Sequence, residues 1–238
     1  MPNKPSIQTG EFYHVYNRGV EKRDVFCARV DYIRFIHDLF EFNDTRPAPE
    51  FARRYDPANY VGRLTSHTSH IRPGKKIVEV AAFCLMKNHY HLLIRPLVDG
   101  GLSSFMLKLG TGYTNAFNAK NARVGSLFQG PYKAKHVDRD EYLQYLICYI
   151  HLNPLKFLQK LDKNRKINFV RTWEALNKYR WSSHLDYLGE DNFGSVIEKK
   201  FILELFGKTV GYKEFVREWM KDEAEKFDFV SSIAIDLE

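Results

Sequence analysis

Residues 83–96 read Phe83-Cys-Leu-Met-Lys-Asn-His-Tyr-His-Leu-Leu-Ile-Arg-Pro96. Apolar residues on both sides of a short polar segment predict two strands joined by a tight turn, with the second strand beginning near His89. Side chains on a strand alternate between its faces, so His89 and His91 point one way and Tyr90 points the other. Two imidazoles side by side are a ready pair of ligands for a divalent metal ion. An isolated His-x-His is more often a pair of exposed histidines, so its meaning depends on the rest of the chain.

The surrounding sequence predicts an alternation of strands and helices. Strands are expected at 12–16, 77–85, 89–95 and 132–137, and helices at 31–43, about 103–118, about 140–153, 173–179, 196–206 and 212–227. The order β-α-β-β-α-β-α predicts an α+β fold, a ferredoxin-like or RNA-recognition-motif-like sandwich. We expect a four-stranded antiparallel sheet with additional C-terminal helices.

Proline and polar residues between positions 44 and 76 predict a long irregular insertion within a domain that spans residues 1–156. Residues 157–238 are expected to form a helical C-terminal extension, in which no chemistry is evident.

Composition narrows the class of protein. The 238 residues are 44% hydrophobic and 15% aromatic, which is enough for a sizeable core and excludes wholesale disorder. A net charge of +7 suggests a polyanionic partner, most often nucleic acid, although a basic protein without such a partner stays possible. The three cysteines are far apart, which argues against a disulfide framework or a cysteine-rich zinc site. No signal core or membrane-length apolar run is seen, so we expect a cytoplasmic protein without a membrane partner.

The helix expected at 140–153 carries the second part of a candidate site. One stripe of this helix is apolar, and at 100° per residue a neighbouring stripe groups Tyr142, Tyr145, Tyr149 and Asn153. Pro154 disfavours helix at the residue before it, so the helix is expected to stop at Asn153. If this helix lies against the histidine face of the sheet, Tyr149 and Asn153 meet the two imidazoles. Such a set would hold Mg²⁺ or Mn²⁺ and leave positions for phosphate oxygens, beside a tyrosine that could attack phosphorus.

Five ordered stretches carry a resemblance to a known family. They are Phe12-Tyr-His-Val-Tyr-Asn-Arg-Gly19, Phe83-Cys-Leu-Met-Lys-Asn-His-Tyr-His-Leu-Leu93, Gly125-Ser-Leu-Phe-Gln-Gly130, Tyr145-Leu-Ile-Cys-Tyr-Ile-His-Leu-Asn-Pro154 and Tyr179-Arg-Trp-Ser-Ser-His184. Together they resemble the single-tyrosine HUH transposases of the IS200/IS605 type, and within them the REP-associated tyrosine transposases. His-x-His alone is weak, whereas the ordered set is specific.

The resemblance implies metal-dependent nicking and strand transfer of single-stranded DNA at hairpins or palindromes, through a covalent 5′-phosphotyrosine. It places the nucleophile at Tyr149 and the metal ligands at His89, His91 and Asn153, with Mg²⁺ or Mn²⁺ as cofactor. Transposases of this type often have glutamine at the third ligand position, so Asn153 points to the REP-associated branch. The protein is expected to be a monomer or homodimer, associated with the nucleoid when it is bound to DNA.

Several alternatives stay open. Tyr145 is a rival nucleophile, Asn153 is also explained as a helix-stop residue, and His14 is better explained by packing than by a role in the site. Candidate DNA contacts, each equally explained as a solvated surface residue, are Arg18, Lys22, Arg23, Lys87, Lys133 and Lys135. Rival functions are a noncatalytic nucleic-acid-binding regulator on the same fold and a rolling-circle initiator or relaxase-type nickase. A relaxase would typically show a third metal-binding histidine beside the pair.

Overall fold

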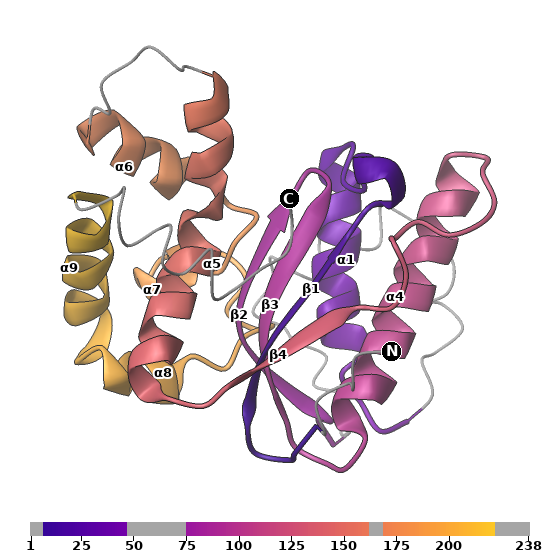
Figure 1. The fold of residues 1–238 in the computed structure, drawn as a ribbon, viewed down its shortest axis with the longest axis horizontal. Coiled ribbons are helices and arrows are strands. Elements are labelled where there is room, and N and C mark those ends of the chain that lie inside the picture. Colours follow the sequence, from indigo (N-terminus) through magenta and orange to yellow (C-terminus); the bar gives the residue numbers. More distant parts are fainter. Residues whose placement is uncertain (1–6, 47–74, 162–168, 222–238) are drawn as a thin grey trace.

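Four strands form the centre of the molecule, in the spatial order β2-β3-β1-β4. The computed structural model describes residues 7–46, 75–161 and 169–221 (Figure 1). Its first seven main elements are β1 (Phe12–Arg18), α1 (Arg29–Glu41), β2 (Val78–Met86), β3 (His89–Pro96), α4 (Gly101–Lys120), β4 (Lys133–Val137) and α5 (Asp140–Leu161). A single 3-10 turn, η1 (Val20–Lys22), follows β1. The predicted order of strands and helices is confirmed.

Every strand pair in the sheet is antiparallel. The two strands of the predicted hairpin, β2 and β3, pair with each other, and β1 lies between β3 and β4. In this register His91 lies opposite Tyr16 on β1 and Cys84 on β2. The α+β sandwich expected from the sequence is therefore present, with residues of three strands meeting around His91.

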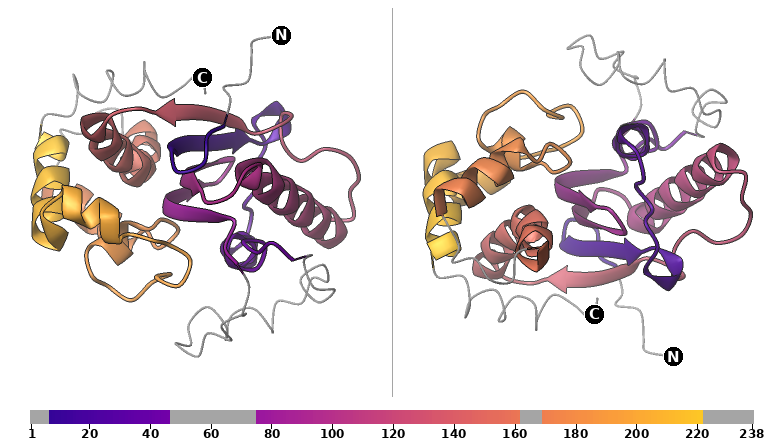
Figure 2. Two further views of the ribbon diagram at one scale, coloured as in Figure 1. Left: turned by 90° about the horizontal axis from the view of Figure 1, so that it is seen from below. Right: turned by 90° about the horizontal axis from the view of Figure 1, so that it is seen from above.

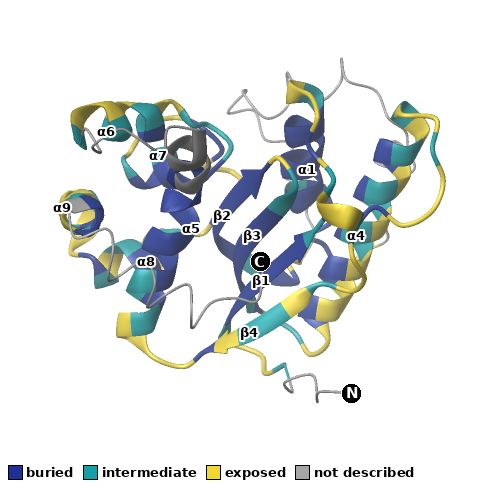
Figure 3. Cartoon of the chain, turned by 45° about the horizontal axis from the view of Figure 1, so that its top comes forward, coloured by how far each residue is buried: buried dark blue, intermediate teal, exposed yellow. Residues whose placement is uncertain are grey.

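Helices cover both faces of the sheet, as Figures 1 and 2 show. Helices α1 and α4 pack on one face, and α5 lies on the other. Tyr90 points to the α1 side, where its ring centroid is 5.0 Å from Phe35 and 5.6 Å from Phe128. The alternation along β3 consequently directs His89 and His91 toward α5. The edge strand β4 is the most exposed of the four, as Figure 3 shows.

The end of α5 differs from the expectation. The prediction that the helix stops at Asn153 was wrong, because α5 continues to Leu161 with Pro154 inside it. Proline removes one backbone donor and disfavours helix at the residue before it. Here Leu152 and Leu155 are both buried, so packing on the two sides of the proline opposes that preference. The proposed domain division at residue 156 falls within this helix and stays a prediction.

The later helices pack beside α5 rather than forming a separate layer on the sheet. They are α6 (Phe169–Lys178), α7 (His184–Tyr187), α8 (Lys200–Leu205) and α9 (Lys208–Lys221). The predicted C-terminal helices are thus present with shifted bounds, and residues 222–227 of the last one lie outside the described residues. Most of the predicted insertion, residues 47–74, lies outside them as well.

The segment between α6 and α7 extends the sheet at its β2 edge. The Leu85 amide donates a hydrogen bond to the Trp181 carbonyl at 2.9 Å, and the Ser183 amide donates to the Phe83 carbonyl at 3.0 Å. Residues 181–183 therefore cover an edge that would otherwise expose unpaired backbone groups. Within the described ranges, no helix has the length and apolar character needed to cross a membrane.

Candidate active site

The two histidines of β3 form the floor of the candidate site. Their ring centroids are 5.1 Å apart and their planes are nearly perpendicular, at 89°. Nδ1 of His89 lies 2.7 Å from Oδ1 of Asn88, and Nδ1 of His91 lies 2.9 Å from Nε2 of His14. With Nδ1 held in this way, each ring would bind a metal ion through Nε2, as metal-binding histidines with hydrogen-bonded second nitrogens do.

Tyr149 lies directly against this floor. Its ring meets the His91 ring edge-on, with centroids 5.5 Å apart and an interplanar angle of 84°, and it meets the His14 ring at 6.2 Å. All three side chains belong to the same chain. Tyr149 is 3% exposed, and burial raises the pKa of its phenol well above the ordinary 10. A side-chain hydrogen bond from Asn153 lowers this pKa by a smaller amount. The phenol is therefore protonated at neutral pH.

Asn153 lies one helical turn beyond Tyr149 and is also buried. Its Nδ2 donates a hydrogen bond to the Tyr149 backbone carbonyl at 3.1 Å. This bond fixes the orientation of the amide and uses its nitrogen, so the side-chain oxygen is the atom that could serve as a metal ligand.

The prediction that Tyr145 lies on the same stripe of α5 as Tyr149 was wrong. The Tyr145 ring packs 5.8 Å from Phe215 and 5.5 Å from Trp219, both on α9. This places it toward the C-terminal helices rather than toward the histidines. Tyr142 stays near the site, where burial, then Asp138 and Tyr16, raise its pKa to about 12.

His14 is part of the site, although the sequence favoured a packing role for it. Its ring lies 5.1 Å from His91 and 5.0 Å from Tyr16, and the residue is fully buried. Burial and then the charge of Lys135 lower the His14 pKa to about 3, so the ring is neutral. The signal in the sequence was the alternation along β1, which puts His14 and Tyr16 on one face.

Two of the candidate DNA-contacting lysines flank the site on β4. Lys133 Nζ lies 5.8 Å from the centroid of the Tyr16 ring, and Lys135 is paired in register with His14. Both therefore emerge on the face that carries the histidines. Arg18 ends β1 opposite His89 in register, at the same end of the sheet as the β2–β3 turn.

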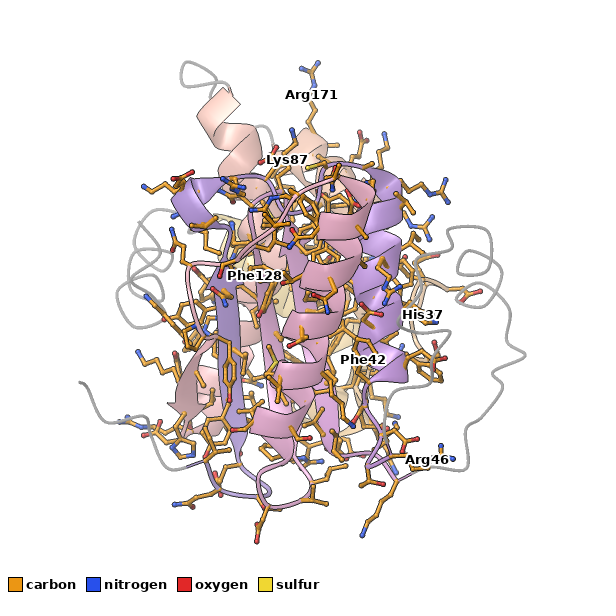
Figure 4. The ribbon with its side chains drawn as sticks, turned by 90° about the vertical axis from the view of Figure 1, so that its right-hand side faces the viewer. His37, Phe42, Arg46, Lys87, Phe128 and Arg171 are labelled. Atoms are coloured by element: carbon orange, nitrogen blue, oxygen red, sulfur yellow. The ribbon has the colours of Figure 1, made fainter. Side chains whose placement is uncertain are left out.

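The other candidates gather around that turn. The Asn88 side chain donates to the Lys22 carbonyl at 3.2 Å, and the amides of Val25 and Phe26 donate to the Lys87 carbonyl. Lys87 thus lies at the His89 end of the sheet, while Arg46 lies at the other end (Figure 4). Arg23 also lies in this loop, but its guanidinium forms an ion pair with Glu21 at 3.1 Å. The structure brings these residues close to the site, and their role in DNA binding stays a prediction.

Two arginines that the sequence did not single out lie at the β2 edge. The Arg180 guanidinium stacks over Trp181 and Phe193, at 5.4 and 5.2 Å from their ring centroids. Trp181 in turn stacks on Tyr32 of α1 at 4.6 Å, which brings Arg29, one turn earlier on α1, to the same place. Burial and then Arg29 lower the Arg180 pKa, and neither arginine has a carboxylate partner within the described residues. In the sequence, the basic and aromatic stretch Tyr179-Arg-Trp could have pointed to Arg180.

The residues present fit a hard divalent cation with few protein ligands. No three His, Cys, Asp or Glu side chains in the described parts of the chain are grouped as a metal site would need. The expected set instead combines two imidazole nitrogens with the amide oxygen of Asn153, which is chemically suited to Mg²⁺ or Mn²⁺ with substrate oxygens completing the shell.

A model of the family described as "Transposase IS200 like" matches residues 63–153, which include both histidines, Tyr149 and Asn153. The resemblance to the IS200-like transposases is confirmed. Among curated proteins, none matches the chain. A solved structure of a REP-associated tyrosine transposase bound to a REP hairpin is 12% identical in sequence to this chain. The aligned region covers 66% of this chain and 74% of the transposase chain, with a TM-score of 0.44.

Proposed function

We propose that this IS200-like protein nicks and rejoins single-stranded DNA at hairpins, with Tyr149 as the nucleophile. The observation that carries the proposal is the edge-on contact of Tyr149 with His91, at 5.5 Å between ring centroids, within one chain. A phenol beside a pair of metal-binding imidazoles, on a basic face of the sheet, is the arrangement that phosphodiester transfer to tyrosine requires.

In the proposed reaction Oη of Tyr149 forms a bond to phosphorus, and the bond from phosphorus to the 3′ oxygen breaks. The phenol loses its proton and the leaving 3′ oxygen takes one up. The products are a 5′-phosphotyrosine ester and a free 3′-hydroxyl. The ester conserves the energy of the phosphodiester bond, so the reverse reaction with a second 3′-hydroxyl joins two strands without ATP.

His89, His91 and Asn153 would hold the divalent cation, Mg²⁺ or Mn²⁺. When bound, this ion supplies Lewis-acid polarisation of the scissile phosphate. Tyr149 is 3% exposed and its phenol has a raised pKa, so the DNA must displace neighbouring groups to reach it. Lys133 and Lys135 would contact the phosphates beside the cleavage site, and Arg29 and Arg180 would contact phosphates on the β2 side. These positive charges favour the binding of the polyanionic substrate.

The proposal is tested with hairpin oligonucleotides in Mg²⁺. A 3′-end label should become covalently attached to the protein, while a 5′-end label should appear in a shorter strand whose 3′-hydroxyl a polymerase can extend. Tyr149→Phe should abolish both products. The matched control is Tyr145→Phe, which removes a phenol on the same helix that faces α9 instead of the histidines.

A broad panel of hairpins that bind without giving any adduct would favour the noncatalytic regulator. An adduct that persists in Tyr149→Phe and vanishes in Tyr145→Phe would move the nucleophile. A relaxase-type site is not favoured, because Nε2 of His14 faces Nδ1 of His91 and so does not join the pair as a third ligand.

A further inference from the structure

We propose that His14 is a positioning residue that fixes the tautomer of His91. In this assignment Nδ1–H of His91 donates a hydrogen bond to Nε2 of His14, and the lone pair of His91 is thereby placed on Nε2. The inference rests on the proposed function, because it assigns a role toward the same divalent cation.

The geometry is that of one well-formed hydrogen bond between stacked rings. The two nitrogens are 2.9 Å apart, the ring centroids are 5.1 Å apart and the planes differ by 18°. Both residues are fully buried, so water does not compete for this bond. His14 comes from β1 and His91 from β3, which makes the contact a cross-strand one that the sheet holds in place.

Only one of the two possible proton arrangements suits a metal ligand. If His14 donated to His91, the proton of neutral His91 would sit on Nε2 and block coordination. If His91 donates, its Nε2 carries the lone pair that a divalent cation needs. A hydrogen-bond acceptor at Nδ1 is the usual way in which proteins select this tautomer.

The other histidine of the pair, His89, also has a hydrogen-bond acceptor at Nδ1, supplied by a different residue. Nδ1 of His89 lies 2.7 Å from Oδ1 of Asn88, and the Asn88 amide nitrogen donates to the Lys22 carbonyl. That second bond orients the amide with its oxygen toward His89, so His89 must donate from Nδ1. Both histidines of the pair are therefore set to present Nε2, one by an amide oxygen and the other by His14.

A further observation argues against a purely structural His14. Its Nδ1 is buried and has no hydrogen-bond partner among the described residues. A buried ring nitrogen without a partner is destabilising, and an apolar residue at this position would avoid that cost. The imidazole is thus explained by what its other nitrogen does for His91.

The test measures metal binding and tautomer state in the full chain without DNA. The variants are His14→Gln, whose side-chain oxygen can reach the position of Nε2, and His14→Asn and His14→Leu, which place no acceptor there. Mn²⁺ affinity, measured by electron paramagnetic resonance, should fall about tenfold in the Asn and Leu variants and stay within about threefold in the Gln variant. The control is His136→Leu, a more exposed histidine on β4 that pairs with Glu11.

Nitrogen-15 NMR of the metal-free protein should show His91 protonated on Nδ1 in the parent and in His14→Gln. In His14→Asn it should show a mixture of tautomers. Equal Mn²⁺ affinity and unchanged His91 tautomer in all folded variants would overturn the proposal, as would His91 protonated on Nε2 in the parent. Because neither readout involves DNA cleavage, failure here is distinguishable from failure of Tyr149 to form an adduct.

Discussion

Nδ1 of His151 lies 2.7 Å from Oη of Tyr212, which ties the helix that carries Tyr149 to α9. Tyr212 also lies 2.6 Å from Nδ1 of His184, and Nε2 of His151 lies 2.7 Å from Oγ of Ser183. These four side chains are fully buried. Two residues beyond the candidate nucleophile, α5 is therefore anchored by a polar network inside the molecule.

The donors of this network can be assigned in sequence. The Phe83 amide donates to Ser183 Oγ, and Nε2–H of His184 donates to Oδ1 of Asn177, because an amide oxygen can only accept. The hydroxyl of Ser183 donates to His151 at 2.7 Å, a shorter contact than its 3.4 Å to the Phe83 carbonyl. His151 then donates to Tyr212, and Tyr212 donates to His184. Each imidazole is neutral with one donor and one acceptor, so the chain of bonds from β2 to α6 is complete.

Tyr212→Phe should reduce the free energy of unfolding substantially, because it leaves Nδ1 of His151 and Nδ1 of His184 buried without a hydrogen-bond partner. Each unsatisfied buried group costs about 1–3 kcal/mol. Tyr187→Phe is the matched control, since the Tyr187 hydroxyl is buried but makes one hydrogen bond, to the Ala81 carbonyl at 3.0 Å. Urea unfolding at neutral pH should rank Tyr212→Phe as the more destabilised variant. Equal losses in the two variants would show that the network adds nothing beyond a single hydrogen bond.

The free energy of unfolding should fall as the pH is lowered from 7.5 to 5.5. Burial lowers the pKa of His14 and of His184 from 6.5 to about 3, and burial and then His184 lower the pKa of His151. Below pH 6.5 the unfolded chain takes up protons at these positions that the native chain excludes. The contribution of these neutral histidines to the free energy of unfolding is thus fully present above pH 6.5. As the pH falls below 6.5, it declines by about 1.4 kcal/mol per pH unit for each such histidine.

Buried acids work in the opposite direction, because burial raises the pKa of Asp186 and also that of Asp38, where hydrogen bonds and charge from His37 and Arg34 act against the rise. Burial raises the pKa of Asp186 from 3.8 to about 6, so below pH 6 the native state holds a proton that the unfolded state lacks. Between pH 6 and 4 the protonation of Asp186 offsets the loss of stability from about one histidine. The free energy of unfolding therefore still falls as the pH is lowered. Urea unfolding across the pH series gives the slope directly. A protein equally or more stable at pH 5.5 than at 7.5 would contradict the neutral, buried state of these histidines.

Arg180→Gln should weaken the binding of a single-stranded or hairpin oligonucleotide by about threefold to tenfold at low salt. Removal of one phosphate contact should also lower the slope of log affinity against log salt by about 0.7. Arg139→Gln is the control, because the Arg139 side chain, directly before α5, is 76% exposed and its neutralisation changes the net charge equally. Fluorescence anisotropy over a salt series measures both quantities. Identical losses for the two variants would reduce the effect to general electrostatics.

The sheet and the placement of Tyr149 could be predicted from the sequence because both depend on periodicity. Alternation on β3 separates Tyr90 from its neighbouring histidines, and the stripe of α5 that carries Tyr149 follows from 100° per residue. The family resemblance then supplied the roles, which stay predictions for Tyr149, His89, His91 and Asn153.

The features of the fold and site that the sequence did not predict depend on contacts between distant segments. Pro154 argued for a helix end by its local preference, whereas the packing of residues on both sides of it keeps α5 continuous. Tyr145 lies close enough to Tyr149 on the helical wheel that only the position of α9 separates their faces. The hydrogen bond of His14 requires the register between β1 and β3, which no local pattern contains.

Asn153→Leu should lower the Mn²⁺ affinity if the amide oxygen is a ligand, whereas a residue that only terminates or packs the helix would leave it unchanged. Asn153→Asp is the informative companion. It keeps an oxygen at this position but cannot donate to the Tyr149 carbonyl, so metal affinity should be retained or raised while α5 loses one hydrogen bond. Electron paramagnetic resonance of Mn²⁺ binding and urea unfolding separate these two effects. Should both variants bind Mn²⁺ as the parent does, Asn153 is not a ligand, and the cation would be held by the two histidines and the phosphate oxygens of the substrate.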